Sequence, residues 1–80
     1  MAVTYYVVVY FDRDDEGALK PSDAREVTHV WAAERAASFL ARDRAGAIAF
    51  SRIGDPATGE FQEATIIAQF GEVDLEALSA

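Results

Sequence analysis

The residues best suited to hold a metal ion lie in the polar segment 12–23. Four acids there could supply oxygen ligands: Asp12, Asp14, Glu16 and Asp23. Oxygen ligands at alternate positions, followed by a turning glycine such as Gly17, are typical of a calcium-binding loop. The segment departs from that pattern because Lys20 adds a positive charge, Asp23 is shorter than the usual closing glutamate, and a strand is predicted before it. Two interpretations stay open: weak calcium binding, and an acidic hairpin loop that turns at Gly17.

No other group of side chains forms a recognisable catalytic pattern. His29 is the only histidine, and a role as general base or metal ligand would require partners such as Glu26 or Asp23. Cysteine is absent, which removes disulfides, thiol nucleophiles and cysteine-based metal sites. The segment 54–59 lacks the lysine and the length of a phosphate-binding loop and is interpreted as a turn. We therefore predict no catalytic residues and no cofactor, and a non-catalytic protein is favoured over an enzyme.

Length and composition predict one folded domain over residues 1–80. Hydrophobic residues make up 51% of the chain and aromatic residues 11%, which is enough for a core and unlike a disordered segment. The formal charge is −7, so nucleic acid is not an expected partner, because binding to phosphate backbones depends on clustered Lys and Arg.

The first residues lack a basic leader and a stretch long enough to span a bilayer. No membrane partner and a cytoplasmic location are therefore expected.

The first predicted strand is apolar on both of its faces. Residues 3–11 are β-branched or aromatic at every position, which favours a strand. One face consists of Tyr5, Val7, Val9 and Phe11, and the other of Tyr6, Val8 and Tyr10. A strand with one face in water would alternate apolar and polar residues. This strand must therefore be covered on both sides.

The other expected elements complete a small sheet with one helix. A second strand is expected within 24–30, an alanine-rich helix over 32–45 with Gly46 as its left-handed cap, and further strands over 47–53 and 61–70. Residues 74–78 predict one terminal helical turn. The order β-β-α-β-β predicts an α+β fold: a single four-stranded, mostly antiparallel sheet with one helix on one face.

One helix covers only one face of such a sheet, and the first strand is apolar on both. We therefore predict that Tyr6, Val8 and Tyr10 line a helix-free face, on which a homodimer or a dedicated protein partner docks. The reverse assignment would leave an equally apolar set outside. Alternatively, the terminal segment 75–78 folds back and covers that face within one chain.

These patterns favour a non-catalytic protein-interaction module that self-associates through the sheet face around residues 5–11. The alternatives are a small-ligand-binding protein or enzyme with its site at a dimer interface, and weak calcium binding by the 12–23 loop. Every basic residue lies at or before Arg52, whereas 53–80 carries six acids: Asp55, Glu60, Glu63, Glu72, Asp74 and Glu76. This acidic region is interpreted as a solvated face or as a docking surface for a basic partner.

Several short segments are similar to those of known bacterial proteins. These segments are VYFDRD at 9–14, AGAIAFSR at 45–52, GDP at 54–56, GEF at 59–61 and FGEV at 70–73. Through them the chain resembles, over nearly its whole length, a group of small bacterial proteins of unknown function. The resemblance implies a self-contained bacterial domain. It carries over no activity, cofactor or site residue.

Overall fold

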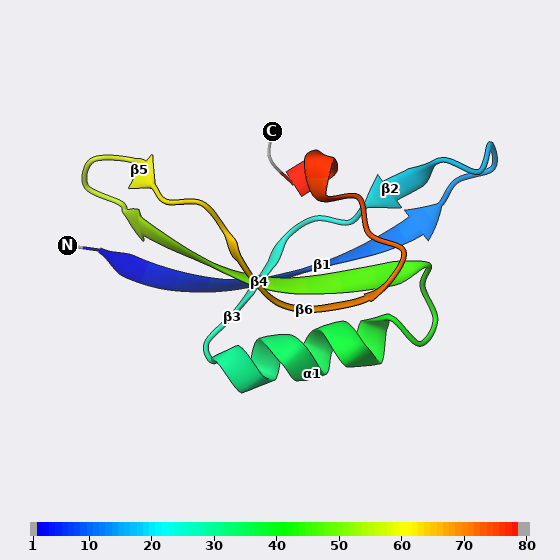
Figure 1. Cartoon of the computed structure of the whole chain (residues 1–80), viewed down its shortest axis with the longest axis horizontal. Helices are drawn as coiled ribbons and strands as arrows, with labels where there is room; N and C mark the ends of the chain where they lie inside the picture. The colour runs from blue at the N-terminus through cyan, green and yellow to red at the C-terminus, as the bar shows by residue number, and fades with distance from the viewer. Residues whose placement is uncertain (1, 79–80) are drawn as a thin grey trace.

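A curled antiparallel sheet packs one of its faces against a single helix (Figure 1). The computed structural model describes residues 2–78. Its elements, in chain order, are β1 (Val3–Arg13), β2 (Leu19–Pro21), β3 (Arg25–Val27), α1 (Val30–Leu40), β4 (Gly46–Asp55), β5 (Glu60–Phe61), β6 (Thr65–Gly71) and the 3₁₀ helix η1 (Leu75–Leu78). The Cα atoms extend over 42 × 25 × 15 Å. The helix lies across β1, β4 and β6.

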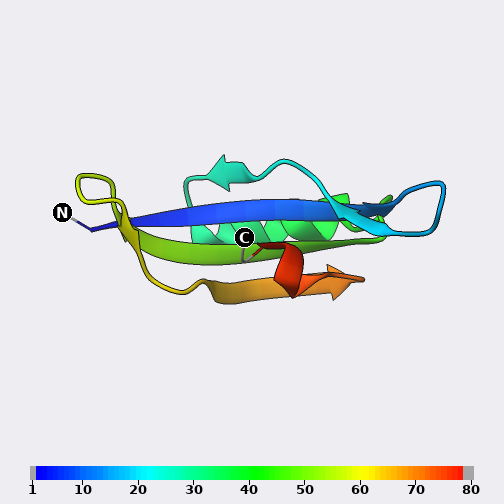
Figure 2. The same cartoon turned by 90° about the horizontal axis from the view of Figure 1, so that it is seen from above.

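The predicted α+β class with one helix is confirmed, but the predicted four-stranded sheet is wrong. The sheet has six strands, three before the helix and three after it. β2 and β3 pair with one edge of β1, β4 pairs with its other edge, and β5 and β6 pair with the far side of β4 (Figure 2). β3 lies within the predicted second strand, β2 lies in the segment predicted as a loop, and the predicted fourth strand is divided between β5 and β6.

Local irregularities account for the divided strands. Between β2 and β3 the side chain of Ser22 enters the ladder, because the Tyr10 amide donates to Ser22 Oγ at 3.0 Å. Residues 62–64 separate β5 from β6, and within β6 the register against β4 shifts between Ala49 and Phe50. Such bulges bend and twist a strand. As a result the β1–β2 and β4–β5 ends of the sheet both turn away from α1, and the face without the helix is concave along the strands (Figure 1).

The helix is shorter than predicted and begins earlier. His29 is its N-cap residue and Ala41 its C-cap residue, with φ −65° and ψ −15°. Gly46 is not the left-handed cap that the sequence predicted, because it begins β4 and pairs with Gly71. The left-handed glycines of the described chain are Gly17, Gly59 and Gly71. The predicted turns at Gly17 and Gly59 are thus confirmed.

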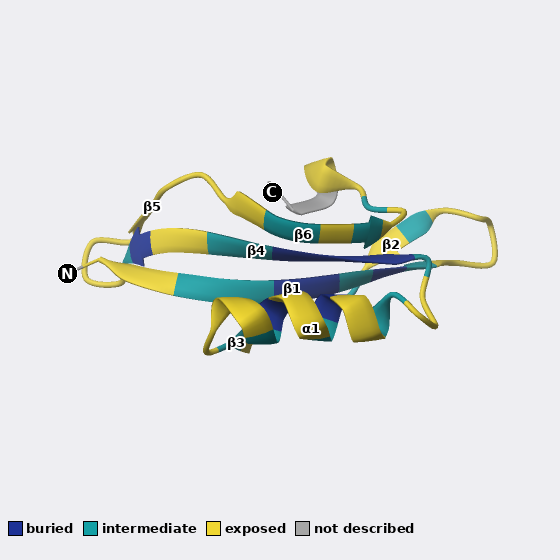
Figure 3. Ribbon diagram, turned by 60° about the horizontal axis from the view of Figure 1, so that its bottom comes forward, coloured by how far each residue is buried: buried dark blue, intermediate teal, exposed yellow. Residues whose placement is uncertain are grey.

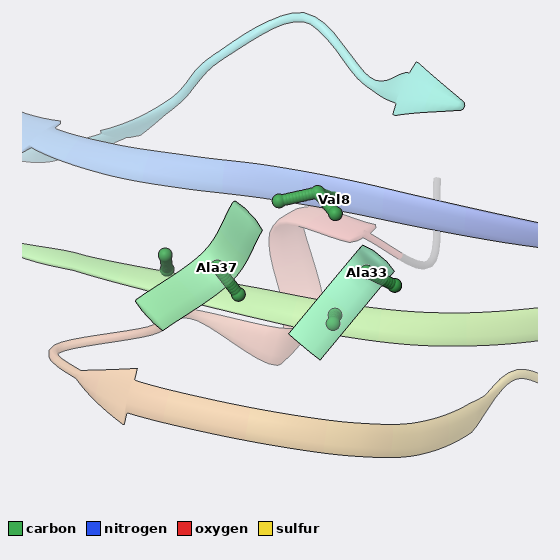
Figure 4. Packing of buried hydrophobic residues seen from close by; sticks show 5 residues of the cluster. Val8, Ala33 and Ala37 are labelled. Carbon is green, nitrogen blue, oxygen red and sulfur yellow. The ribbon is translucent and has the colours of Figure 1, made fainter. Parts of the chain in front are cut away.

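A cluster of small residues forms the core beneath the helix (Figure 4). Its buried members are Val8, Ala33, Ala37, Ala47 and Ala49. The alanines of β4 lie opposite residues of β1, and those of α1 face them across the interface. Because no large side chain separates the layers, the helix lies close to the sheet, as its alanine content predicted.

A second cluster lies on the other face of the sheet and consists of Val9, Phe11 and Ile48. Phe11 is 0% exposed although no helix covers it. Its cover comes from the chain itself, because Leu19 and Val73 pack against the cluster and η1 follows directly after Val73. Val73 thus covers part of this face, and Leu75 of η1 lines a hollow together with Ile48 and Phe50. The predicted terminal helical turn is confirmed.

Candidate functional site

The three residues predicted to line the helix-free face lie on the helix-covered face instead. Val8 is buried against α1, and Tyr6 and Tyr10 pack around the same cluster. The physical reason lies in β4, where Val8 pairs with Ala49 and Tyr10 pairs with Ala47. These small partners leave room for a helix. The larger residues Ile48 and Phe50, which alternate with them on β4, lie on the other face. The face assignment was therefore wrong, and the reverse set of β1 residues faces away from the helix.

The helix-free face contains a groove with an apolar floor. Tyr5, Val7 and Val9 of β1 line it together with Phe50 of β4, and the segment after β2 forms one wall. Its volume is about 600 Å³. In Figure 2, which looks onto this face, η1 lies in front of β4, and the halves of β1 and β4 nearer β5 stay open. The open half of the sheet is thus the exposed part of an otherwise covered face.

An aromatic side chain, Phe61, forms the opposite wall of the groove. Phe61 is 49% exposed and contacts the Tyr5 ring at 6.0 Å between centroids. It occupies this place because Gly54, its partner across the β4–β5 pair, has no side chain. A Cβ atom at Gly54 would overlap the Phe61 ring. Gly54 therefore makes the room in which Phe61 lies.

A second hollow of about 340 Å³ continues the groove across β4. Phe50 and Arg52 line both spaces, so the two are contiguous. Ile66 and Leu75, which are 48% and 46% exposed, line the second hollow. An apolar surface thus runs from β1 over β4 to β6 and η1. We call it the groove surface.

One cation lies in the middle of the groove surface. The Arg52 guanidinium carbon lies 5.6 Å from the centre of the Phe61 ring, and its Nε donates to the Gln62 carbonyl at 3.1 Å. In the described part of the chain, ion pairs join Arg13 to Glu72 and Arg44 to Asp12, and none involves Arg52. Glu26 lines one hollow beside Arg52 and Glu63 the other. The groove surface therefore combines a cation that has no ion pair in the described chain with acids on both sides.

Two of the four acids of the predicted calcium loop bind other groups of the chain. Asp12 accepts a hydrogen bond from Arg44 at 2.9 Å, while Asp14 accepts backbone hydrogen bonds within the turn. Across residues 2–78 no group of three or more metal-ligating side chains lies close enough to hold a metal ion. The structure thus does not bring Asp12, Asp14, Glu16 and Asp23 together as ligands, and it matches the interpretation of an acidic hairpin loop.

Asp14 instead organises the β1–β2 turn. Its Oδ1 accepts hydrogen bonds from the amides of Ala18 and Glu16, each at 2.9 Å. The pKa of the Asp14 carboxyl is lowered, chiefly by the Ala18 hydrogen bond; desolvation opposes this effect, and the Glu16 hydrogen bond and the charge of Lys20 lower the pKa further. A carboxyl group whose pKa is lower in the folded state stabilises the fold above its unfolded pKa of about 3.9, and this contribution is lost as the pH falls through the folded value.

We expect Asp14→Ala to melt at a lower temperature than the wild type at neutral pH. The difference in melting temperature between the two proteins should become smaller as the pH falls below about 4, because the wild-type carboxylate then becomes protonated. Thermal unfolding followed by circular dichroism between neutral and acidic pH measures this. Asp15→Ala, one residue along the same exposed turn, is the matched control and should show no such pH-dependent gap. If Asp14→Ala lowered the melting temperature equally at all pH values, the ionised Asp14 carboxylate would not be the stabilising group.

His29 lies at the N-terminus of α1 as its N-cap residue. Its backbone carbonyl accepts the Ala33 amide at 3.1 Å, and its ring stacks on Trp31 with centroids 5.8 Å apart and an interplanar angle of 8°. Neither of the acids considered as its partners forms a hydrogen bond or ion pair with it in the described chain. His29 is therefore an N-cap residue that supports an exposed tryptophan.

The sequence interpretation missed Arg52 and Phe61. The signal for Arg52 was present, because it is the last basic residue before a wholly acidic segment. The signal for Phe61 was the preceding Gly54, which can be recognised as its partner only when the β4–β5 register is known. Both residues belong to the groove surface.

No family model, curated protein or solved structure matches this chain. The resemblance to small bacterial proteins therefore stays a prediction. In residues 2–78, no helix has the length and apolar character needed to cross a membrane.

Proposed function

We propose that this protein is a non-catalytic interaction module that self-associates through the groove surface. The observation that carries the proposal is the open, apolar half of the helix-free face, where Phe61, Ile66 and Leu75 each remain 46–49% exposed. Contiguous exposed apolar side chains on a small domain usually mark a contact surface. The predicted self-association thus moves from Tyr6, Val8 and Tyr10 to the alternate positions of β1.

The shape of the sheet favours a second copy as the occupant. A twisted sheet that is concave along its strands is convex across them, and two such sheets pack face to face with strands crossing at about 90°. The two ends of the sheet rise on the side away from α1, which gives this concavity (Figure 1). If a second copy is turned by about a right angle, the direction in which its sheet is convex lies along the direction in which the first sheet is concave. The two surfaces then fit together.

The charges on the groove surface are also self-complementary. In a two-fold dimer each contact between two different residues occurs twice. Arg52 of one copy can then approach Glu26 or Glu63 of the other, and the reciprocal pair forms at the same time. Because Arg52 has no ion pair within the described chain, the contact would add pairs without breaking any. This arrangement favours a two-fold dimer over a one-sided contact.

We expect the wild type to form a dimer and Phe61→Ser to weaken it about 30-fold. Burial of the exposed half of a phenylalanine contributes about 1 kcal/mol, and a two-fold interface contains it twice. Sedimentation equilibrium over a range of micromolar concentrations gives the dissociation constant directly. Circular dichroism of the variant establishes that the loss is not a loss of folding.

Phe39→Ser is the matched control for this experiment. Phe39 is 66% exposed but lies on the helix, on the opposite side of the sheet, so its replacement should leave the dimer intact. Self-association is refuted when the wild type stays monomeric at the highest concentrations. It is assigned to the wrong surface when Phe39→Ser dissociates the dimer and Phe61→Ser does not.

A second candidate, an apolar anionic ligand, is favoured by the groove volume of about 600 Å³ and by Arg52 in its wall. Ligand sites commonly have volumes of about 300–1,000 Å³ with a few polar groups that fix orientation. The same sedimentation experiment separates the candidates. A wild type that stays monomeric, yet binds an anionic apolar dye saturably and loses this binding in Arg52→Gln, would favour the ligand.

A further inference from the structure

The outward side of α1 carries exposed aromatic side chains. Trp31 is 59% exposed and Phe39 is 66% exposed, and both lie on α1. Figure 3 shows exposed residues along the outward side of this helix. Arg35, Ser38 and Arg42 are exposed on the same side. Trp, Tyr and Arg contribute most of the binding energy at protein interfaces, whereas a solvated helix face usually carries polar and charged residues. The composition of this side is therefore that of an interface.

The spacing of these residues defines a second seam on the helix. Positions 31, 35 and 38 follow one another at intervals of four and three residues, which places them in one line along α1, and Arg42 follows four residues later in the turn after the helix. Ala33 and Ala37, which are buried against the sheet, lie on the opposite side. The same spacing joins helices in pairs, with the small Ser38 allowing close approach at the centre. We call Trp31, Arg35, Ser38, Phe39 and Arg42 the outer stripe.

The charge on the outer stripe is positive and unpaired. In the described part of the chain, the ion pairs involve Arg13 and Arg44, and neither Arg35 nor Arg42 forms one. A shallow hollow of about 480 Å³ lies between the helix and Phe70 of β6, with both arginines in its lining. Glu34 also lines this hollow, at its edge. A partner that fills the hollow must therefore bring negative charge to Arg35 and Arg42 and an apolar group to Phe39.

We propose that the outer stripe binds an acidic amphipathic helix of another protein. Arg35 lies on α1 and Arg42 lies in the turn after the helix, and both line the same hollow. Two carboxylates on one face of a partner helix, seven residues and about 10 Å apart, can meet both arginines at once. Apolar residues between these carboxylates would pack between Trp31 and Phe39. This binding site is separate from the groove surface and does not depend on self-association.

Two other occupants fit the outer stripe less well. Arginines and aromatic rings also bind single-stranded nucleic acid, but a continuous phosphate chain would pass Glu34 and Asp43 on a protein of charge −7. The acidic C-terminal third of a second copy would make a head-to-tail contact, which does not close and leads to open chains of subunits. Each of these occupants gives a distinct result in the experiment below.

The experiment uses Trp31 as its probe, because it is the only tryptophan of the chain. The titrant is a synthetic amphipathic helical peptide with Leu on one face and Glu at seven-residue spacing along that face. A second peptide replaces each of these Glu residues with Lys. We expect the Glu peptide to shift Trp31 emission to shorter wavelength, saturably, since the ring leaves water. The Lys peptide should bind at least about tenfold more weakly, because Arg35 and Arg42 would repel it.

Charge reversal tests the arginines directly. We expect Arg35→Glu/Arg42→Glu to invert the preference, so that the Lys peptide binds about tenfold more tightly than the Glu peptide. Phe39→Ser should weaken binding of the Glu peptide, while Phe61→Ser should leave it unchanged and so separates this site from the proposed dimer. No saturable shift with the Glu peptide, or equal binding of both peptides, would overturn the proposal. A shift produced by single-stranded DNA, or by raising the protein concentration alone, would assign the outer stripe to the other occupants.

Discussion

Phe11→Ala should lower the free energy of unfolding by about 3–5 kcal/mol, the largest effect expected from a single truncation in this chain. Phe11 is 0% exposed and packs with Val9 and Ile48 on the face without the helix. Its replacement removes the apolar contacts of the ring and leaves a cavity that strands on a sheet cannot close. For a domain of this size the melting temperature should fall by about 15 °C or more.

The same variant tests whether the terminal segment covers this part of the sheet. Leu19 and Val73 pack against the cluster that contains Phe11. Urea unfolding of Phe11→Ala and Phe61→Ala compares two aromatic residues on the same face, one buried and one 49% exposed. The cost at Phe61 should be less than half of that at Phe11. Similar small costs at both positions would show that the terminal segment does not lie over Phe11 in solution.

Gly71→Ala should destabilise the fold by about 2–5 kcal/mol through two separate effects. Gly71 has a φ of +68°, where a side chain costs about 1–2 kcal/mol. A Cβ atom there would also overlap the carbonyl oxygen of Ala45, and such overpacking costs about 1–3 kcal/mol more. The Glu72 amide donates to the same Ala45 carbonyl at 2.9 Å, so the chain cannot move away without losing this bond.

Gly17→Ala separates the cost of the positive φ from the cost of the overlap with Ala45. Gly17 has a φ of +82°, but no atom lies within 4 Å of a Cβ built there, so only the backbone strain applies. Chemical denaturation of the two variants should therefore show a clearly larger loss for Gly71→Ala. The end of β6 leads directly into Val73 and η1, and a displaced Gly71 should also expose the Phe11 cluster to an apolar dye. Equal losses in the two variants would mean that β6 can move away from Ala45 at little cost.

Several features of the fold could be predicted from the sequence because they depend on local chemistry. The β-branched and aromatic run at 3–11 forms a strand wherever it lies, and Gly17 and Gly59 turn the chain because each can adopt a positive φ. The alanine-rich segment forms the helix, although its bounds shifted to Val30–Leu40. The end of the helix depends on where β4 begins, and the close contact of Gly46 with the Glu72 backbone requires the paired strands.

The face that the helix covers could not be read from β1, because both of its faces are apolar. The deciding signal lay in β4, where Ala47 and Ala49 alternate with Ile48 and Phe50. A helix lined by Ala33 and Ala37 packs most closely over the small residues, so it covers Ala47 and Ala49. The β1–β4 register then places Val8 beneath the helix. The residues of β1 alone therefore do not indicate which of its faces the helix covers.

The candidate sites divide in the same way. The outer stripe follows from the sequence once the helix is known, since its spacing is local and its exposed Trp31 and Phe39 lie opposite the buried alanines. The groove surface was decided only by the tertiary structure, because it joins residues from β1, β4, β5, β6 and η1 that no spacing in the sequence connects. The sequence alone determined that β1 must be covered on both faces. Only the packing of the chain decided that the helix covers one face and the terminal segment half of the other, because burial depends on which distant segments have side chains small enough to approach.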